Sequence, residues 1–278
     1  MKIIADSSST RTEWSLVDCD TVVEHAYTQG LNPYFLSRRE ISHSIRLELP
    51  ETFFKHRWEH IFFYGAGCAN EDKNKIMEMS LVAQFKTPVT IESDLLGAAR
   101  GLFVNTPGIA CILGTGSNSC VYDGSKITRN VRPAGFILGD EGSGADLGKQ
   151  FVADCLKNLA PVKLHHEFFE KFSLTSDAVM DAVYTATSPN RTLSRYATFL
   201  ADHLDNEYVV NLVTRSFERF FDRNIAAYAE FRHLPLGFVG STAIMFADLL
   251  RKVAYTRGLE ISKIARASMP GLIKFHTD

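Results

Sequence analysis

The stretch Lys2-Ile3-Ile4-Ala5-Asp6-Ser7-Ser8-Ser9-Thr10 decides the fold, and Ile109-Ala110-Cys111-Ile112-Leu113-Gly114-Thr115-Gly116-Ser117-Asn118 repeats its pattern. In each, an apolar run typical of a strand enters a turn of small hydroxyl residues or glycine, and another strand-like run follows. Such turns expose N–H groups and hydroxyls that can surround phosphate oxygens. Two ordinary hairpins are the alternative, because these residues are common in turns. Their recurrence favours a nucleotide held from both sides.

Composition narrows the class of protein. The 278 residues are 45% hydrophobic with a net charge of -2, so a core is expected and nucleic-acid binding is not. Neither a signal peptide nor an apolar run near the ~20 residues of a membrane span is present. Five scattered cysteines without a C-x-x-C pair fit reduced thiols. We expect a cytoplasmic protein whose partners include neither nucleic acid nor membrane.

The order of predicted elements indicates an α/β chain of two similar halves. The first half has predicted strands at 2–5, 12–17, 22–28, 60–64 and 88–92, and helices near 37–47, 71–85 and from 94. The second has strands at 109–113, 118–122, 126–131 and 236–239, and a long helical region at 143–231. Each half also carries a strand entering a small-residue turn, at 62–67 and 237–242. Two lobes facing one cleft would follow, with the helical insert in the second.

Two aspartates follow predicted strands of the first half. Asp6 lies in the first turn, where it could hold Mg²⁺ through its hard carboxylate oxygens or serve only as an Asx-turn residue. Asp94 precedes a helix rich in small residues, where it could take a proton from a hydroxyl or act as a helix N-cap. From the residues alone, the cap is slightly favoured for Asp94.

Two loops of the second half carry groups that could bind a ligand. Gly139-Asp140-Glu141-Gly142-Ser143-Gly144 is an acidic glycine-bounded loop that could bind sugar hydroxyls or simply face solvent. Gly240-Ser241 begins a helix predicted around 243–250, where its amide groups could meet a nucleoside or phosphate, or Ser241 could merely cap that helix.

Taken in order, six motifs resemble those of the N-acetylglucosamine kinases. These belong to the BadF/BadG/BcrA/BcrD ATPase family, within the superfamily of acetate and sugar kinases, heat-shock ATPases and actin. The motifs span the chain: Asp6–Thr12, Gly30-Leu31-Asn32-Pro33, Ser93-Asp94 with Ala98, Gly114–Asn118, Gly139–Ser143 and Gly240-Ser241. The tail Gly271–His276 is also similar to that family.

The resemblance implies a fold and a reaction. The fold would be two ribonuclease H-like, actin-like ATPase lobes, each a mixed five-stranded sheet flanked by helices, with a nucleotide cleft between them. The N-terminal lobe would span 1–105 with the tail 268–278, and the C-terminal lobe 106–267. The reaction would be phosphoryl transfer from ATP with Mg²⁺ to the 6-hydroxyl of an amino sugar, the small-molecule partner, by a protein that forms a homodimer.

The resemblance also assigns roles to residues. Asp94 would be the catalytic base, and Asp6 would hold Mg²⁺. ATP would be bound by Asp6, Ser8, Ser9, Thr10, Arg11, Thr12, Gly114, Thr115, Gly116, Gly240 and Ser241. The sugar would be bound by Asn32, Asn118, Gly135, Asp140, Glu141 and Ser143.

Two other functions stay open at this point. A related ATPase activates 2-hydroxyacyl- or benzoyl-CoA reductases through an iron–sulfur cluster held by cysteines between subunits. Here Ser117-Asn118 stands where that cysteine region would be expected, and Cys120 lacks a well-spaced partner. A binding module without turnover is the second alternative, favoured by the serine-rich first turn and opposed by Asp94. The amino sugar itself is not specified by any motif.

Overall fold

The computed structural model describes residues 1–230 and 232–277, and the chain forms two compact units. The first unit holds Met1–Gly108, Tyr122–Thr128 and the segment from Ala267 onward. The second holds Ile109–Val121 and Arg129–Arg266. The last position of the predicted helical region, 231, and the end of the predicted tail, 278, lie outside the described residues.

The first unit is built on a mixed five-stranded sheet in the order β3-β2-β1-β4-β5. Its strands are β1 (Lys2–Ser7), β2 (Arg11–Asp18), β3 (Thr21–Gln29), β4 (His60–Gly65) and β5 (Val89–Ser93). β1 pairs antiparallel with β2 and parallel with β4, and β4 pairs parallel with β5. The carboxyl ends of β1, β4 and β5 therefore meet at one edge, which brings Asp6 and Ser93 to the same end of the sheet.

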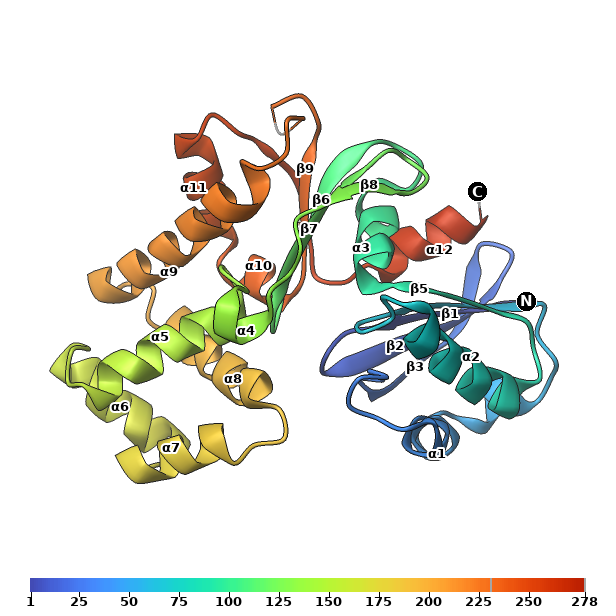
Figure 1. Cartoon of the computed structure of the whole chain (residues 1–278), viewed down its shortest axis with the longest axis horizontal. Coiled ribbons are helices and arrows are strands. Elements are labelled where there is room, and N and C mark those ends of the chain that lie inside the picture. The colour runs from blue at the N-terminus through green and yellow to red at the C-terminus, as the bar shows by residue number, and fades with distance from the viewer. Residues whose placement is uncertain (231, 278) are drawn as a thin grey trace. The chain divides into compact units, whose positions relative to one another are not determined.

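Helices cover both faces of this sheet because side chains alternate along β1. Ile3 and Ala5 pack in one core with the buried faces of α1 (Arg38–Glu48) and α2 (Glu71–Phe85). Ile4 faces the other way and packs with Met269 of α12 (Met269–Thr277). α12 lies beside α3 (Asp94–Phe103), as Figure 1 shows. A short 3-10 turn, Glu51–Phe54, completes the unit.

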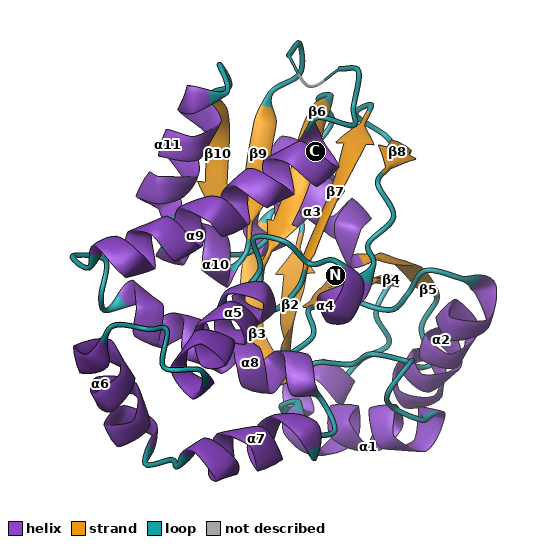
Figure 2. Cartoon of the chain, turned by 60° about the vertical axis from the view of Figure 1, so that its left-hand side comes forward, coloured by secondary structure: helices purple, strands orange, loops and turns teal. Residues whose placement is uncertain are grey.

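The second unit has the same sheet plan, in the order β10-β9-β6-β7-β8 (Figure 2). Its strands are β6 (Gly108–Leu113), β7 (Ser117–Tyr122), β8 (Ile127–Asn130), β9 (Leu236–Val239) and β10 (Ile261–Ala265). β9 pairs parallel with both β6 and β10. The duplicated pattern of the sequence is therefore a duplicated sheet.

Most of the helices belong to the second unit, whose core contains many phenylalanines. They are α4 (Gly135–Leu138), α5 (Gly144–Leu156), α6 (Val162–Phe172), α7 (Ser176–Tyr184), α8 (Pro189–Ala201), α9 (Glu207–Phe220), α10 (Ser241–Met245) and α11 (Ala247–Thr256), with a π-helical turn at Phe221–Ile225. The Phe151 ring meets Phe168 of α6 edge-on, with centroids 5.1 Å apart, and stacks on Phe199 of α8, with centroids 5.4 Å apart. Phe220 of α9 packs on Phe238 of β9.

The predicted α/β class with two five-stranded mixed sheets is confirmed. The region predicted as one broken helical stretch contains α5 to α9, and the helix predicted around 243–250 is two helices that meet at Phe246. β10 and α12 were not predicted. No helix among the described residues is long and apolar enough to cross a lipid bilayer.

Candidate active site

The carboxylate of Asp6 lies at the carboxyl end of β1, one residue before the strand ends. The next residue, Ser7, is fully buried, and its hydroxyl bonds to that of Thr12 at 2.8 Å and accepts the N–H of Leu31 at 3.0 Å. Ser268 donates to the Asp6 carboxylate from both its hydroxyl and its backbone N–H. Asp6 is thus fixed by the C-terminal segment and is no ordinary Asx-turn residue, since the turn itself closes around Ser8.

Asp94 is the first residue of α3, and it is not the helix cap. Ser93 takes that position, because its hydroxyl accepts the N–H of Leu96 at 3.2 Å. The capping role considered for Asp94 is therefore wrong by one residue. Asp94 lies in the first turn, where the helix dipole favours a negative charge, and its carboxylate accepts the N–H of Leu95, at 2.9 Å, and its own backbone N–H.

The two aspartates have strongly perturbed acidities. Burial raises the pKa of Asp94 from 3.8 to about 6, against the opposing hydrogen bond from Leu95. Burial also raises the pKa of Asp6 to about 7, with a further rise from the nearby charge of Asp94. Two carboxylates with such values at the end of one sheet are typical of a functional site.

The pair fits Mg²⁺. Within residues 1–230 and 232–277, no Lys or Arg forms an ion pair with either carboxylate, so their mutual repulsion has no protein cation to offset it. The described residues hold no cluster of three or more His, Cys, Asp and Glu that could bind a metal unaided. Mg²⁺ does not need one, since it commonly takes one or two carboxylates plus substrate phosphates and water.

The first turn uses part of its own hydrogen-bonding capacity. The hydroxyl of Ser8 accepts the N–H groups of Thr10 and Arg11, each at 3.3 Å, and donates to the Arg11 carbonyl. Thr12 is fully buried and donates to the carbonyl of Gln29 at 2.9 Å, so it holds the sheet together and is withdrawn from any ligand. At the tip of the turn Thr10 is exposed and Ser9 is partly exposed, and the guanidinium of the neighbouring Arg11 packs over Tyr27.

Asn32 is carried by the loop that supports this turn. At Gly30 a Cβ would lie 2.5 Å from the Ser8 carbonyl oxygen, so only glycine lets the loop pass beneath the turn. Asn32 is buried, and its Oδ1 accepts the N–H of Tyr34 at 2.9 Å. Gly67, which has a φ of +84°, comes so close that a Cβ there would overlap Asn32 Oδ1 at 2.2 Å. The amide group of Asn32 is thus held in one orientation.

In the second unit, the Gly114–Gly116 turn is fixed from behind. The carbonyls of Gly114 and Thr115 accept the N–H groups of Gly144 and Ala145, at 2.8 and 3.1 Å, at the start of α5. The hydroxyl of Thr242 also donates to Gly114, at 2.9 Å. Because the carbonyls of Gly114 and Thr115 are bonded to the start of α5, the turn is held in place from that side.

Gly240 joins β9 to α10 in a conformation that needs glycine. Its φ is +127°, and a Cβ would lie 2.4 Å from the Leu113 carbonyl oxygen. The backbone of Gly240 therefore touches the end of β6, where the Gly114 turn begins. Ser241 is exposed and makes no side-chain cap to α10. The capping alternative for Ser241 is thus wrong.

The two acidic residues of the Gly139–Gly144 loop, Asp140 and Glu141, differ in their contacts. Asp140, in the left-handed region at φ +57°, accepts the N–H of Ser117 at 3.2 Å and keeps part of its surface exposed. Burial raises the pKa of Asp140. Glu141 is paired with Arg223 at 2.6 Å, and Ser143 is fully buried as the N-cap of α5. Asp140 is thus held by one backbone N–H through its carboxylate, whereas Glu141 is held by an ion pair and Ser143 by the start of α5.

The other two residues predicted to bind the sugar are Asn118, whose side chain is hydrogen-bonded, and Gly135, which has open space around it. Asn118 is partly exposed, and its Oδ1 accepts the Asn130 side chain at 3.0 Å and the N–H of Ser119 at 2.9 Å. Gly135 is exposed in the short helix α4 with φ +71° and nothing within 4 Å of a Cβ, so it could approach a ligand with its backbone.

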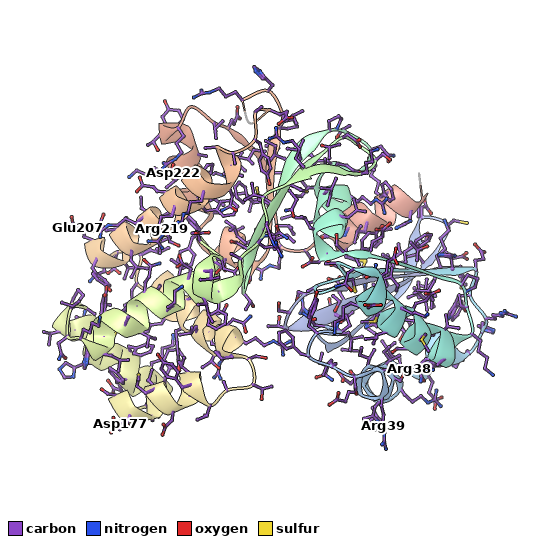
Figure 3. The ribbon with its side chains drawn as sticks, viewed as in Figure 1. Arg38, Arg39, Asp177, Glu207, Arg219 and Asp222 are labelled. Atoms are coloured by element: carbon purple, nitrogen blue, oxygen red, sulfur yellow. The ribbon has the colours of Figure 1, made fainter. Side chains whose placement is uncertain are left out.

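A network that the sequence analysis missed fixes this acidic loop. Buried Asp146 accepts the hydroxyl of Ser216 at 2.6 Å and the guanidinium of Arg219 at 2.8 Å, from α9, where Arg219 is labelled in Figure 3. Ser216 in turn accepts the N–H of Gly142 at 3.0 Å. No local pattern connects residues so far apart in sequence. Only Asp146 could have been suspected, as an acidic residue on the apolar face of a predicted helix.

The chain is similar in structure to several solved proteins. A candidate N-acetylglucosamine kinase from Porphyromonas gingivalis is 39% identical, with 100% of this chain and 99% of that chain covered and a TM-score of 0.95. A second candidate N-acetylglucosamine kinase, from Chromobacterium violaceum, is 19% identical over 99% and 98% of the two chains, with a TM-score of 0.78. A ROK family glucokinase from Streptomyces griseus, solved with glucose and AMPPNP, is 13% identical over 99% and 97%, with a TM-score of 0.55. The last two share the fold.

No protein-family model matches the chain, and no curated protein does.

Proposed function

The chain belongs to the N-acetylglucosamine kinase-like proteins of the BadF/BadG/BcrA/BcrD ATPase family, and from that premise we propose that it phosphorylates an amino sugar. The phosphoryl donor is ATP, the acceptor is the 6-hydroxyl, and N-acetylglucosamine is the substrate. We place the reaction in the cytoplasm, where ATP is available and free cysteines stay reduced.

Asp94 carries this proposal. Its carboxylate is not needed to cap α3, because Ser93 does that, and its pKa of about 6 leaves it mostly ionised at neutral pH. A base is most effective when its pKa lies near the working pH, since it is then ionised yet basic enough to accept a proton. A structural aspartate would instead be expected to carry a cap or an ion pair.

The proposed step is a single displacement. As the sugar 6-oxygen forms a bond to the γ-phosphorus, its proton passes to Asp94, and the bond from phosphorus to the β,γ-bridging oxygen breaks. That oxygen keeps the electron pair and leaves on ADP. Such transfers depend mainly on positioning and charge neutralisation, so one base and two rigid phosphate-binding turns are sufficient machinery.

The phosphate-binding roles follow from which groups lie at the tip of each turn. In the first unit we assign them to Ser9, Thr10 and Arg11, with Ser8 shaping the turn. In the second, the open side of Gly114–Gly116 would meet phosphate, and Gly240-Ser241 the nucleoside. Asp6 would hold Mg²⁺, which neutralises phosphate charge when bound.

The residues predicted to bind the sugar fall into two groups: those that could contact it and those that hold the loop in place. Asn32, Asn118 and Asp140 present polar groups that could bond sugar hydroxyls, and the backbone of Gly135 is open. Glu141 and Ser143 are used by Arg223 and by the start of α5, so we assign them to positioning Asp140.

The cysteines do not favour the iron–sulfur activator. Cys68, Cys111, Cys120 and Cys155 are buried, and only Cys19 is exposed. A cluster shared between subunits requires several accessible thiolates. A binding module without turnover would not need Asp94 with an acidity suited to a base.

A panel of sugars tests the proposal. Purified protein with ATP and Mg²⁺ should release ADP in the presence of N-acetylglucosamine, and glucosamine, N-acetylmannosamine and muramic acid derivatives define selectivity. ADP release that needs no sugar would indicate an ATPase. ATP binding without ADP release for any sugar would indicate a binding module.

A further inference from the structure

The C-terminal segment reaches the site through Ser268. This serine directly precedes α12, is only 5% exposed, and donates both its hydroxyl and its backbone N–H to the carboxylate of Asp6. Its carbonyl accepts the N–H groups of Gly271 and Leu272, at 3.1 and 3.0 Å, so it also begins the helix. A residue from the end of the chain therefore contacts the first acidic residue of the site.

Close backbone contact holds Ser268 in place. A Cβ on Gly271 would lie 1.9 Å from the Gly101 carbonyl oxygen, and a Cβ on Gly101 would lie 2.6 Å from Ser268 Cβ. Two glycines thus let α12 touch α3 directly, as the neighbouring helices in Figure 1 show. Because α3 begins at Asp94, one helix pair positions both Asp94 and the partner of Asp6.

The far end of α12 is fastened by a chain of polar contacts. Arg100 donates to the Tyr64 hydroxyl at 2.9 Å, and that hydroxyl also forms a hydrogen bond with Nε2 of His276 at 2.8 Å. The His276 ring stacks on Phe62 with centroids 3.8 Å apart, and Lys2 donates to the His276 carbonyl at 2.8 Å. The helix is therefore anchored at both ends on the sheet that carries Asp6.

We propose that Ser268 is a positioning residue for Mg²⁺, orienting the Asp6 carboxylate so that its remaining lone pairs face the metal and the phosphates. This inference rests on the proposed function. The two donors from Ser268 occupy two of the lone pairs of the Asp6 carboxylate and leave others for a cation. Carboxylates that ligate metals are commonly held by such hydrogen bonds, and losing one typically costs 10- to 100-fold in metal affinity or activity.

Direct metal binding tests this role. With ADP present, Mn²⁺ binding followed by electron paramagnetic resonance should weaken about tenfold in Ser268→Ala, because the backbone donor remains. Sugar affinity should stay within about twofold of wild type. Ser37→Ala is the matched control, since Ser37 caps α1 in the same unit without touching Asp6. It should be destabilised to a comparable extent, since it too loses a hydroxyl that accepts a helix N–H, and it should keep its Mn²⁺ affinity.

The isosteric pair Ser268→Thr and Ser268→Val separates the hydroxyl from packing, because both crowd Gly101 equally. Threonine should retain most of the Mn²⁺ affinity and valine should lose it. Equal affinities in this pair, or Ser268→Ala within about twofold of wild type, would overturn the role of Ser268.

A measurement on the unmodified protein avoids any failure to fold. The backbone amide resonance of Ser268 should shift when Mg²⁺ and ADP are added together, and should not shift with ADP alone. An unmoved Ser268 amide, in protein that binds the metal, would overturn this inference alone. Failure of wild type to bind Mn²⁺ with ADP would overturn the kinase proposal as well.

Discussion

Replacing Asp94 by asparagine should make the protein more stable and nearly inactive. The new side chain keeps an oxygen that can accept the N–H of Leu95, and Ser93 still caps α3, so the fold loses no hydrogen bond. What disappears is the proton acceptor. General base catalysis contributes about 10²- to 10⁴-fold, and turnover should fall by that factor while ATP and sugar still bind.

The stability change follows from the raised pKa. The pKa of Asp94 rises from 3.8 to about 6 on folding, so the folded state holds the proton more tightly. Well below pH 3.8 the carboxyl is neutral in both states. Between pH 3.8 and about 6 stability falls, and above that the ionised group costs up to about 3 kcal/mol at 1.36 kcal/mol per unit. Partial solvent contact reduces that figure.

Two assays on the same samples check this prediction. Denaturant unfolding at pH 8 should give Asp94→Asn a higher free energy of unfolding than wild type, and at pH 3.5 most of that difference should be gone. Coupled ADP release at saturating substrates should show the loss of turnover, with calorimetry confirming that both ligands bind. Turnover within threefold of wild type would refute the role of Asp94 as base, and a variant destabilised at pH 8 would refute the effect of burial.

Three further outcomes are expected. The wild-type kcat/KM for the sugar should fall as the pH drops through about 6, because Asp94 must be ionised to accept a proton, and a rate profile from pH 5 to 8 would show this. Asp140→Asn, which tolerates the left-handed backbone, should weaken sugar binding at least tenfold by calorimetry, since a charge-assisted hydrogen bond is worth about 1.5–3 kcal/mol, and should leave ATP binding unchanged. Gly240→Ala should lose at least about 1–3 kcal/mol in denaturant unfolding, because φ is +127° and the Cβ meets the Leu113 carbonyl.

The pattern of apolar runs and turn residues along the sequence was sufficient to predict most strands of the two sheets. β1 and β6 are apolar runs ending in small-residue turns, and β9 coincides with the predicted 236–239 because Leu236–Val239 is buried throughout. β10 was missed because Ser262 and Lys263 are exposed on an edge strand, which weakens its apolar signal. The break at Phe246 was missed because apolar residues continue through it at helical spacing.

The candidate site was predicted only as far as single segments allow. Motifs identify Asp6, Asp94 and Asp140, since each follows a strand or lies in a glycine-rich loop. They cannot show that Thr12 is buried, that Glu141 is paired with Arg223, or that Ser268 contacts Asp6, because these depend on tertiary contacts between segments distant in sequence. The sequence analysis considered Asp94 as the N-cap of α3, one residue after the actual cap Ser93, because serine and aspartate are both good capping residues.

The product of the reaction tests the central claim most directly. Protein incubated with ATP, Mg²⁺ and N-acetylglucosamine should form one equivalent of sugar phosphate per ADP, and phosphorus–carbon coupling in its NMR spectrum should place the phosphate on the 6-oxygen. Asp94→Asn should form it at least about a hundredfold more slowly. Phosphate on any other oxygen, or ADP without a sugar phosphate, would contradict the account.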